Sequence, residues 1–243
     1  GGGMRSLKKI VASLVVLVFA SACATQTLKQ TDQLVAKRPD AGQRIVVIAP
    51  DVELSELTAG GLKVPNAEWT EKAQGNIKNE IQRILADSNA NVLYASDLNE
   101  PGTESETEVQ LVKLHEIVGA SIILSRFQAL PTKKDVFDWS LGPDAKALRE
   151  EYGADYGLFL FVRGSYSSAG RVAGMVFAAI LGVGVQGGTQ AGYASLVDLA
   201  TGEIVWFNTL GRGTGDLREP GPAAETVDLL LANFPTTANG DDG

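Results

Sequence analysis

Residues 143–168, PDAKALREEYGADYGLFLFVRGSYSS, decide the fold because a helix and a strand follow one another within them. Pro143 stands where a helix can begin, and the pattern predicts a short helix over Ala145–Tyr152 that ends at Gly153. The apolar and aromatic residues 156–167 then predict a strand. A helix that leads directly into a strand is typical of a chain in which the two alternate.

The same alternation extends toward the amino terminus. RIVVIAP, residues 44–50, holds a continuous apolar run that a proline stops, which predicts a buried strand, and we expect residues 51–68 to form a long loop. Apolar residues at helical spacing predict an amphipathic helix over residues 68–88, and residues 91–97 predict a short strand. Acidic residues at the start of 104–127 favour a second long helix, although its apolar positions fit one face less cleanly.

Toward the carboxyl terminus the pattern changes to a β-hairpin. Residues 193–199 and 203–210 predict its two arms, and Gly202 supplies the positive φ that a tight turn needs. Residues 222–234 predict a closing helix. Strands separated by helices favour a parallel portion of sheet, and the hairpin adds an antiparallel one. We therefore expect a single α/β domain over residues 44–235, with helices packed on a mixed β-sheet.

An apolar, glycine-rich insertion at residues 170–190 separates the long strand from the hairpin. No charged side chain occurs from Val172 to Val197, and a small residue recurs at every fourth position from Gly170 to Gly182. The segment could be a helix that another helix approaches closely, a pair of extended segments that enter a membrane or a neighbouring subunit, or a buried loop. As a helix, its apolar part would measure about 21 Å, which is shorter than a bilayer core of about 30 Å.

We interpret the insertion as an association surface, since a contiguous apolar patch usually marks a place of contact. Packing on the domain's own core and a membrane-inserted hairpin remain the alternatives. The residues expected to form this surface are Arg171, Gly174, Met175, Phe177, Ile180, Leu181 and Val183.

The first 22 residues have the layout of a secretory signal peptide. Gly1 to Gly3 precede Met4 and are interpreted as an artefact, and basic residues, an apolar run and small residues then lead to Cys23. This order resembles a bacterial lipobox, so we expect Cys23 to be lipidated, with palmitate as an attached acyl chain. A plain secretory signal and an uncleaved anchor are the alternatives, although the apolar run is only about half of the roughly 20 residues that span a bilayer.

The remaining segments outside the domain are polar. We expect residues 23–43 to be a lipidated tether and residues 236–243 to be a disordered tail. Ala24 follows the cysteine in place of the aspartate that retains enteric lipoproteins in the inner membrane. By that resemblance, the protein would be lipid-anchored on the periplasmic face of the outer membrane.

The charge of the chain argues against a nucleic-acid partner. The 243 residues carry a formal net charge of −8, and removal of Arg5, Lys8 and Lys9 with the signal lowers the charge of the mature chain to −11. Nucleic-acid binding needs basic patches that displace counterions. Cys23 is also the only cysteine, so no disulfide can form within the chain and a packed core must stabilise it.

The sequence contains little that predicts catalysis. His115 is the only histidine, and a metal site or an oriented general base needs several converging groups, so we expect a surface or helix-packing histidine. Residues 182–187 match G-x-G-x-x-G, but a dinucleotide site also needs a following helix and an acidic residue about 20 positions on. We therefore expect no cofactor, no metal site and no enzymatic activity.

Several of these pieces together resemble a known group of proteins. The lipobox at Cys23, RIVVIAP (44–50), LREEYGADYGLFLFV (148–162), the glycine-rich insertion and GYASLVDLATGEIVWFN (192–208) resemble bacterial outer-membrane lipoproteins. Their periplasmic domain is similar to the amino-terminal domain of TolB and to the periplasmic part of the curli secretion channel CsgG. The resemblance covers about residues 44–234. It implies a non-enzymatic α/β domain that assembles into rings or complexes and supports secretion, polymer export or envelope maintenance.

The sequence thus favours a lipid-anchored accessory or assembly protein of the cell envelope. Its expected partners are the membrane, through the lipid on Cys23, further copies of itself, and other envelope or secretion proteins. The alternatives are a cell-envelope hydrolase and a channel component with a membrane-inserted hairpin.

Overall fold

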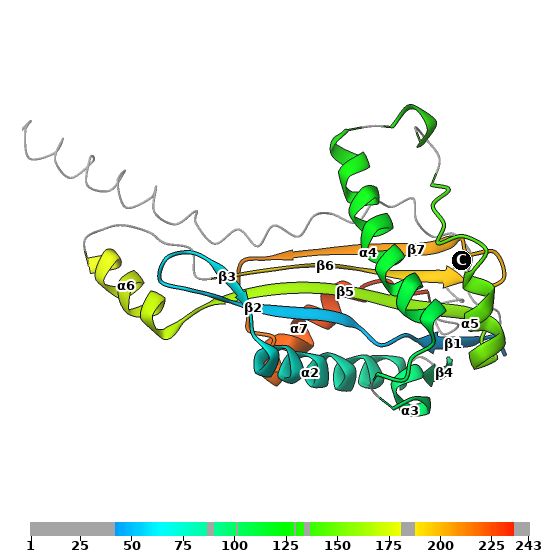
Figure 1. Cartoon of the computed structure of the whole chain (residues 1–243), viewed down its shortest axis with the longest axis horizontal. Helices are drawn as coiled ribbons and strands as arrows, with labels where there is room; N and C mark the ends of the chain where they lie inside the picture. The colour runs from blue at the N-terminus through cyan, green and yellow to red at the C-terminus, as the bar shows by residue number, and fades with distance from the viewer. Residues whose placement is uncertain are drawn as a thin grey trace, which may run out of the picture.

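The computed structural model describes residues 42–86, 90–100, 102–128, 130–133, 137–180 and 188–235. Within these residues, a seven-stranded mixed sheet lies between two layers of helices, as expected for an α/β fold (Figure 1). The signal peptide, nearly all of the tether, and the tail lie outside the described residues.

The sheet is organised around β5, which is the strand predicted at Tyr156–Ser167. Along one edge, β5 pairs antiparallel with β6 (Gly188–Asp198). Along its other edge it pairs parallel first with β1 (Arg44–Val47) and then with β2 (Asp51–Leu57). Since both short strands follow the same edge of β5, they run one after the other along the sheet (Figure 1).

A β-bulge separates β1 from β2. Val47 is opposite Leu158 and Asp51 is opposite Phe161, so three residues on the β1 side stand against two residues of β5. The extra residue is the mark of a bulge, and Pro50 is tolerated within it because a bulge requires fewer ladder hydrogen bonds. The expected strand therefore ends before the proline, as β1, and a second strand, β2, continues along the same edge of β5 after it.

The prediction of a long loop at residues 51–68 is wrong. β2 and β3 (Lys63–Pro65) form an antiparallel hairpin there. Residues 51–57, DVELSEL, alternate in polarity, and the apolar side chains of Val52 and Leu54 are buried. The physical reason is that β5 is much longer than β1, so its remaining edge needs a second partner.

The two outer strands complete the sheet. β4 (Asn91–Tyr94) pairs parallel with β1 and ends where β1 ends. The observed strand is therefore shorter than the strand expected at residues 91–97. It is followed by the short helix α3 (Ala95–Leu98). β7 (Ile204–Arg212) forms the predicted hairpin with β6.

The turn of this hairpin requires glycine at position 202. Gly202 has a φ of +79°, as predicted. A Cβ atom there would also lie 2.0 Å from the carbonyl oxygen of Gly142. The turn therefore packs against Gly142, which lies shortly before the helix α5 (Ala145–Tyr152).

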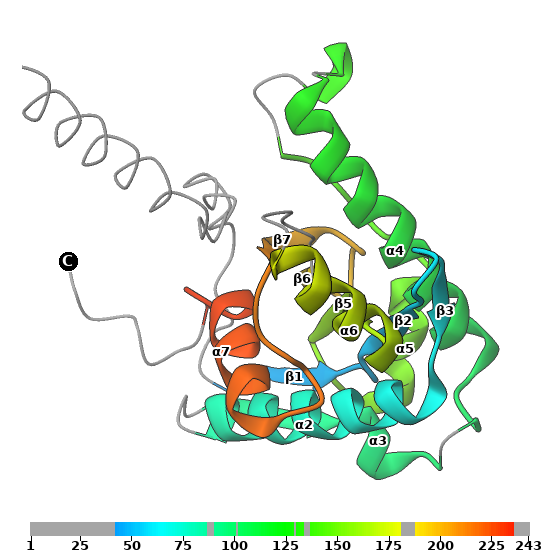
Figure 2. The same cartoon turned by 90° about the vertical axis from the view of Figure 1, so that its left-hand side faces the viewer.

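Helices α2 and α7 cover one face of the sheet (Figure 2). α2 (Ala67–Ala86) matches the predicted amphipathic helix, and its buried residues lie at helical spacing. α7 (Pro220–Leu230) begins and ends earlier than the expected 222–234, because Pro220 is suited to the first turn of a helix. Ile45 and Val47 of β1 face this layer.

Helices α4 and α5 cover the other face. α4 (Glu106–Phe127) is capped by Ser105, whose hydroxyl oxygen accepts from the backbone N–H of Glu108 at 3.2 Å. α5 (Ala145–Tyr152) has the predicted bounds and ends at Gly153 in the left-handed conformation. Val46 of β1 faces this layer, since successive residues of a strand point to opposite faces.

Two further elements lie outside the layers. α6 (Ala169–Ile180) follows β5 directly and lies beyond the end of the β2–β3 hairpin (Figure 1). A short 3-10 helix, η1, spans Pro131–Lys133. Among the described residues, no helix combines the length and the apolar character needed to cross a membrane.

Candidate functional site

The first part of the apolar insertion is helical. α6 begins directly after β5, and the Ser168 hydroxyl accepts from the backbone N–H of Arg171 at 3.1 Å, which is an N-cap. Met175 lies one turn further on, where its sulfur accepts from the hydroxyl of Ser167 at 3.5 Å. Of the three alternatives left by the sequence, the structure therefore selects the helix for residues 169–180.

The expected association surface is only partly described. Arg171, Gly174, Met175, Phe177 and Ile180 all belong to α6. Leu181 and Val183, and with them the G-x-G-x-x-G match, lie outside the described residues, as does Cys23.

α6 presents apolar side chains to solvent. Val172 and Val176, one turn apart on the helix, are both exposed. In the sequence of α6, Gly170, Gly174 and Ala178 recur at a spacing of four. Among the residues whose exposure the structure describes, α6 presents Val172 and Val176 to solvent.

α4 has apolar residues on two opposite sides, which explains why its sequence fits no single helical face. Its inner side, with Leu111, His115 and Ile122, packs on the sheet. Its outer side carries Ile117, Leu124 and Phe127, which are 64%, 62% and 73% exposed. We call these three residues the outer stripe of α4.

The outer stripe is the surface that sequence reasoning missed. Ile117, Leu124 and Phe127 follow a spacing of seven and three, which keeps them on one side of the helix as in a coiled-coil seam. In Figure 1, α4 rises from the sheet so that its carboxyl-terminal half stands clear of the other labelled elements. The signal in the sequence was the excess of apolar residues over what one buried face can use.

His115 is a packing residue in the core. It is 1% exposed, and its Nε2 atom lies 2.8 Å from the hydroxyl of Ser195 on β6. Its ring contacts those of Phe159 and Tyr193, with centroids 5.4 and 5.3 Å away. Burial lowers the pKa of His115 to about 3, so the neutral imidazole helps to fix α4 on the sheet.

A cavity of about 440 Å³ lies at the carboxyl ends of the parallel strands β1 and β4. Ala49 and Pro50 of the bulge form part of its lining, and Ala95 at the start of α3 forms another part. Ligands of α/β proteins commonly bind outside the carboxyl ends of parallel strands. Pockets for small molecules measure about 300–1,000 Å³.

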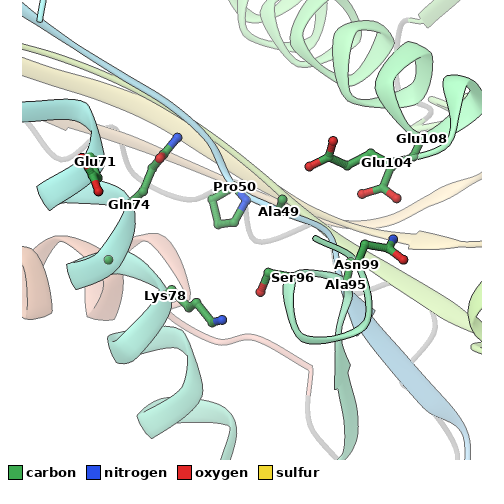
Figure 3. A pocket seen from close by; sticks show the side chains of 11 residues that line it. Ala49, Pro50, Glu71, Gln74, Lys78, Ala95, Ser96, Asn99, Glu104 and Glu108 are labelled. Carbon is green, nitrogen blue, oxygen red and sulfur yellow. The ribbon is translucent and has the colours of Figure 1, made fainter. Parts of the chain in front are cut away.

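Polar side chains from two segments face each other across this cavity (Figure 3). α2 contributes Glu71, Gln74 and Lys78, Glu104 comes from the loop before α4, and Glu108 comes from the first turn of α4. In the close-up, the carboxylates of Glu104 and Glu108 lie on the opposite side of Pro50 from the α2 residues.

A chain of hydrogen bonds positions Glu108 at the cavity. The side-chain amide of Asn99 donates to the hydroxyl oxygen of Tyr152 at 2.7 Å, and the Tyr152 hydroxyl in turn donates to Glu108. Glu108 is buried, and burial raises the pKa of its carboxyl above the ordinary glutamate value, although the bond from Tyr152 opposes this change. The carboxyl group is therefore held in a fixed place.

No protein-family model and no curated protein sequence matches the chain. A point variant of the PelC dodecamer from Paraburkholderia phytofirmans is 16% identical, over 83% of this chain and 94% of that one, with a TM-score of 0.39. Lipoprotein GNA1162 from Neisseria meningitidis is 14% identical, over 70% of this chain and 81% of that one, with a TM-score of 0.32. The LpoB C-terminal domain from Salmonella enterica is 16% identical, over 75% of this chain and 87% of that one, with a TM-score of 0.25.

Similarity at this level supports no statement about a ligand, a partner or an assembly of this chain. The resemblance to TolB and CsgG therefore stays a prediction. In the part of the chain that the structure describes, no three histidine, cysteine, aspartate or glutamate side chains come together as a candidate metal site.

Replacing Glu108 with glutamine is expected to change how stability depends on pH. A carboxyl whose pKa is raised by folding stabilises the folded state fully below the unfolded pKa, and this contribution is lost as the pH rises through the folded pKa. The free energy of unfolding of the wild type should therefore fall relative to that of Glu108→Gln as the pH rises above 4.5, by at most about 1.4 kcal/mol per pH unit.

Urea unfolding of both proteins between pH 4 and pH 7 measures this difference. Glu150→Gln is the control, because Glu150 is exposed on α5. If the difference between wild type and Glu108→Gln stays constant over this pH range, the carboxyl of Glu108 is not perturbed by the fold.

Proposed function

We propose that this chain is a lipid-anchored accessory protein of the bacterial cell envelope that works by non-covalent association, first of all with copies of itself. The observation that carries the proposal is the outer stripe of α4. Its three large apolar side chains are exposed on a helix whose other side is already packed on the sheet. Exposed apolar patches on soluble domains usually mark a contact with another molecule.

The fitting surface for the outer stripe is α6 of a neighbouring copy. α6 and α4 lie far apart along the long axis of the molecule (Figure 1), so one copy cannot bring its own two helices together. The stripe is bulky, whereas α6 has the small residues Gly170, Gly174 and Ala178 at helical spacing. Small residues on one helix allow the large side chains of another to pack closely.

A contact between two different surfaces has consequences for assembly. Such a heterologous contact leaves one α4 and one α6 unused in every pair, so further copies add until the chain of contacts closes into a ring or continues as a filament. Association by α6 and α4 therefore predicts more than a dimer.

Few charged residues lie at this contact, although the chain as a whole is acidic. Between Ile117 and Phe127, the only charged residue is Arg126, whose guanidinium carbon lies 5.8 Å from the centroid of the Phe207 ring. α6 contains only Arg171 as a charged residue. Each helix thus carries a single charge over this stretch, and both charges are arginines, so the contact must keep Arg126 and Arg171 apart.

Sedimentation velocity of the full chain with Cys23→Ser tests the association. We expect a concentration-dependent oligomer for this protein and a monomer when Ile117 and Leu124 are both replaced with aspartate. Both side chains are exposed, so the double variant should keep its free energy of unfolding. Replacing Gly174 and Ala178 with bulky polar residues should have the same effect from the other helix.

Leu98→Asp is the matched control, because Leu98 is an exposed apolar residue of α3 and belongs to neither α4 nor α6. The control should sediment as the parent protein does. A parent protein that is monomeric at all concentrations, or an unchanged mass of the double aspartate variant, would contradict the proposal.

Membrane fractionation of Cys23→Ser tests the anchor. If the lipid on Cys23 is the sole anchor, the unlipidated protein becomes soluble. If that protein still partitions with membranes after its signal peptide has been removed, the apolar insertion itself enters the membrane, which favours the channel alternative.

A further inference from the structure

We propose that the cavity at the carboxyl ends of β1 and β4 binds a small aliphatic amine, with an ammonium group held by Glu104, in the loop before α4, and by Glu108 in its first turn. This site is separate from the outer stripe and does not depend on association. It would make the protein a receptor for a cationic small molecule in addition to an assembly unit.

The charges around the cavity determine the class of ligand. Three carboxylates line it, from Glu71, Glu104 and Glu108. Lys78 is the only cation among the described lining residues, and its Nζ lies 2.6 Å from Oδ1 of Asp97, which offsets its charge. Charge-assisted hydrogen bonds between an ammonium group and carboxylates are short and strong, so the cavity favours a cation over an anion.

The apolar part of the lining determines the rest of the ligand. Ala49, Pro50 and Ala95 are small and aliphatic, and the described lining includes no aromatic side chain. Rings of sugars and nucleobases usually stack on aromatic side chains. An aliphatic chain that lies over the alanine and proline surface therefore fits better than a ring.

Gly75 lines the cavity from the interior of α2, where glycine costs about 1 kcal/mol relative to alanine. A Cβ atom at this position would meet no atom within 4 Å, so packing of the fold does not require the glycine. Position 75 is therefore one at which a large side chain can be introduced to fill the cavity.

Glu108 is a positioned charge rather than a surface carboxylate. It is 1% exposed, and the hydrogen bonds from Asn99 through Tyr152 hold it in one place. A buried carboxylate is costly unless a partner compensates its charge. An ammonium ion in the cavity would supply that compensation.

Cadaverine (1,5-diaminopentane) is the probe for this site, and glutarate, which has the same chain length with carboxylates at both ends, is the matched anion. The full chain with Cys23→Ser is titrated with each by calorimetry and by ¹⁵N-edited NMR. We expect saturable binding of one cadaverine per chain, with shifts confined to residues around positions 49–50, 75–78, 95–99 and 104–108, and no binding of glutarate.

Four variants separate this site from general attraction to an acidic protein. Glu104→Gln should weaken cadaverine binding about tenfold, because it removes one charge-assisted bond, whereas Glu150→Gln removes the same charge elsewhere and should leave the affinity unchanged. Gly75→Trp should abolish binding by filling the cavity. Gly75→Ala should remain folded and bind.

The outcomes decide the proposal in both directions. Absence of saturable cadaverine binding, equal binding of glutarate, or an equal effect of the two glutamine variants would overturn it. The oligomeric state, measured on the same samples, reports separately on the proposed function.

Discussion

The free energy of unfolding is expected to fall by about 2 kcal/mol between pH 7 and pH 5 because of His115 alone. In the folded protein, burial lowers the pKa of His115 to about 3 from an ordinary value of 6.5. Between these two values only the unfolded chain binds the proton. The stability that the neutral imidazole provides is therefore fully present above pH 6.5 and is lost as the pH falls toward 3.

His115→Gln isolates this effect, because glutamine can place an amide near Ser195 where the Nε2 atom of the histidine lies. Guanidinium unfolding of the two proteins between pH 5 and pH 7.5 should give a difference that shrinks as the pH falls. Glu108 acts in the opposite direction over part of this range, which is why the comparison must be with a variant at position 115. A constant difference would show that His115 has the same pKa in the folded and the unfolded chain.

The same substitution, glycine to alanine, is expected to have opposite effects in α4 and α2. A Cβ atom at Gly119 would lie 2.1 Å from Cε2 of Tyr193. The tyrosine ring cannot move aside easily, since it stacks between Phe161 and Phe207 with centroids 4.7 and 5.7 Å away. Gly119→Ala should therefore lower the free energy of unfolding by about 1–3 kcal/mol, the usual cost of overpacking.

Gly75→Ala in α2 is the matched control. Its Cβ atom meets no neighbour within 4 Å, so the better helix propensity of alanine should raise the free energy of unfolding by about 1 kcal/mol. Denaturant unfolding at pH 7 measures both variants. A Gly119→Ala protein that is as stable as the wild type would mean that α4 does not pack on Tyr193 as closely as the structure shows, and a destabilised Gly75→Ala protein would mean that position 75 is not open.

Local patterns in the sequence predicted much of the fold. The bounds of α5 and β5 came from one stretch in which a proline, a left-handed glycine and an apolar run mark the ends. The mixed sheet and the final hairpin followed from the order of elements and from Gly202. These features depend on residues close together in the chain, which is where sequence patterns are most informative.

The features that were missed depend on contacts between distant segments. The β2 strand forms because β5 extends beyond β1, and no local signal in residues 51–57 reveals the length of that partner. For His115 the sequence left open a surface position and a packing position, and the packing position depends on Ser195, which is 80 residues away.

The candidate surfaces differ in how far they could be predicted. The helix in the insertion was one of three possibilities, and the spacing of Gly170 and Gly174 was its best sign. The outer stripe of α4 was visible only as an excess of apolar residues, because the sequence alone does not say which side packs on the sheet. The cavity was not predictable, since four segments meet there only after folding.

Disulfide trapping tests most directly whether α6 of one copy packs on the outer stripe of the next. In the Cys23→Ser protein, Val176→Cys on α6 and Leu124→Cys on α4 place thiols at two exposed positions. Mild oxidation of the double variant should give a ladder of covalently linked chains, and each single variant should give none. Single chains from the double variant, or dimers from Leu124→Cys alone, would contradict this contact.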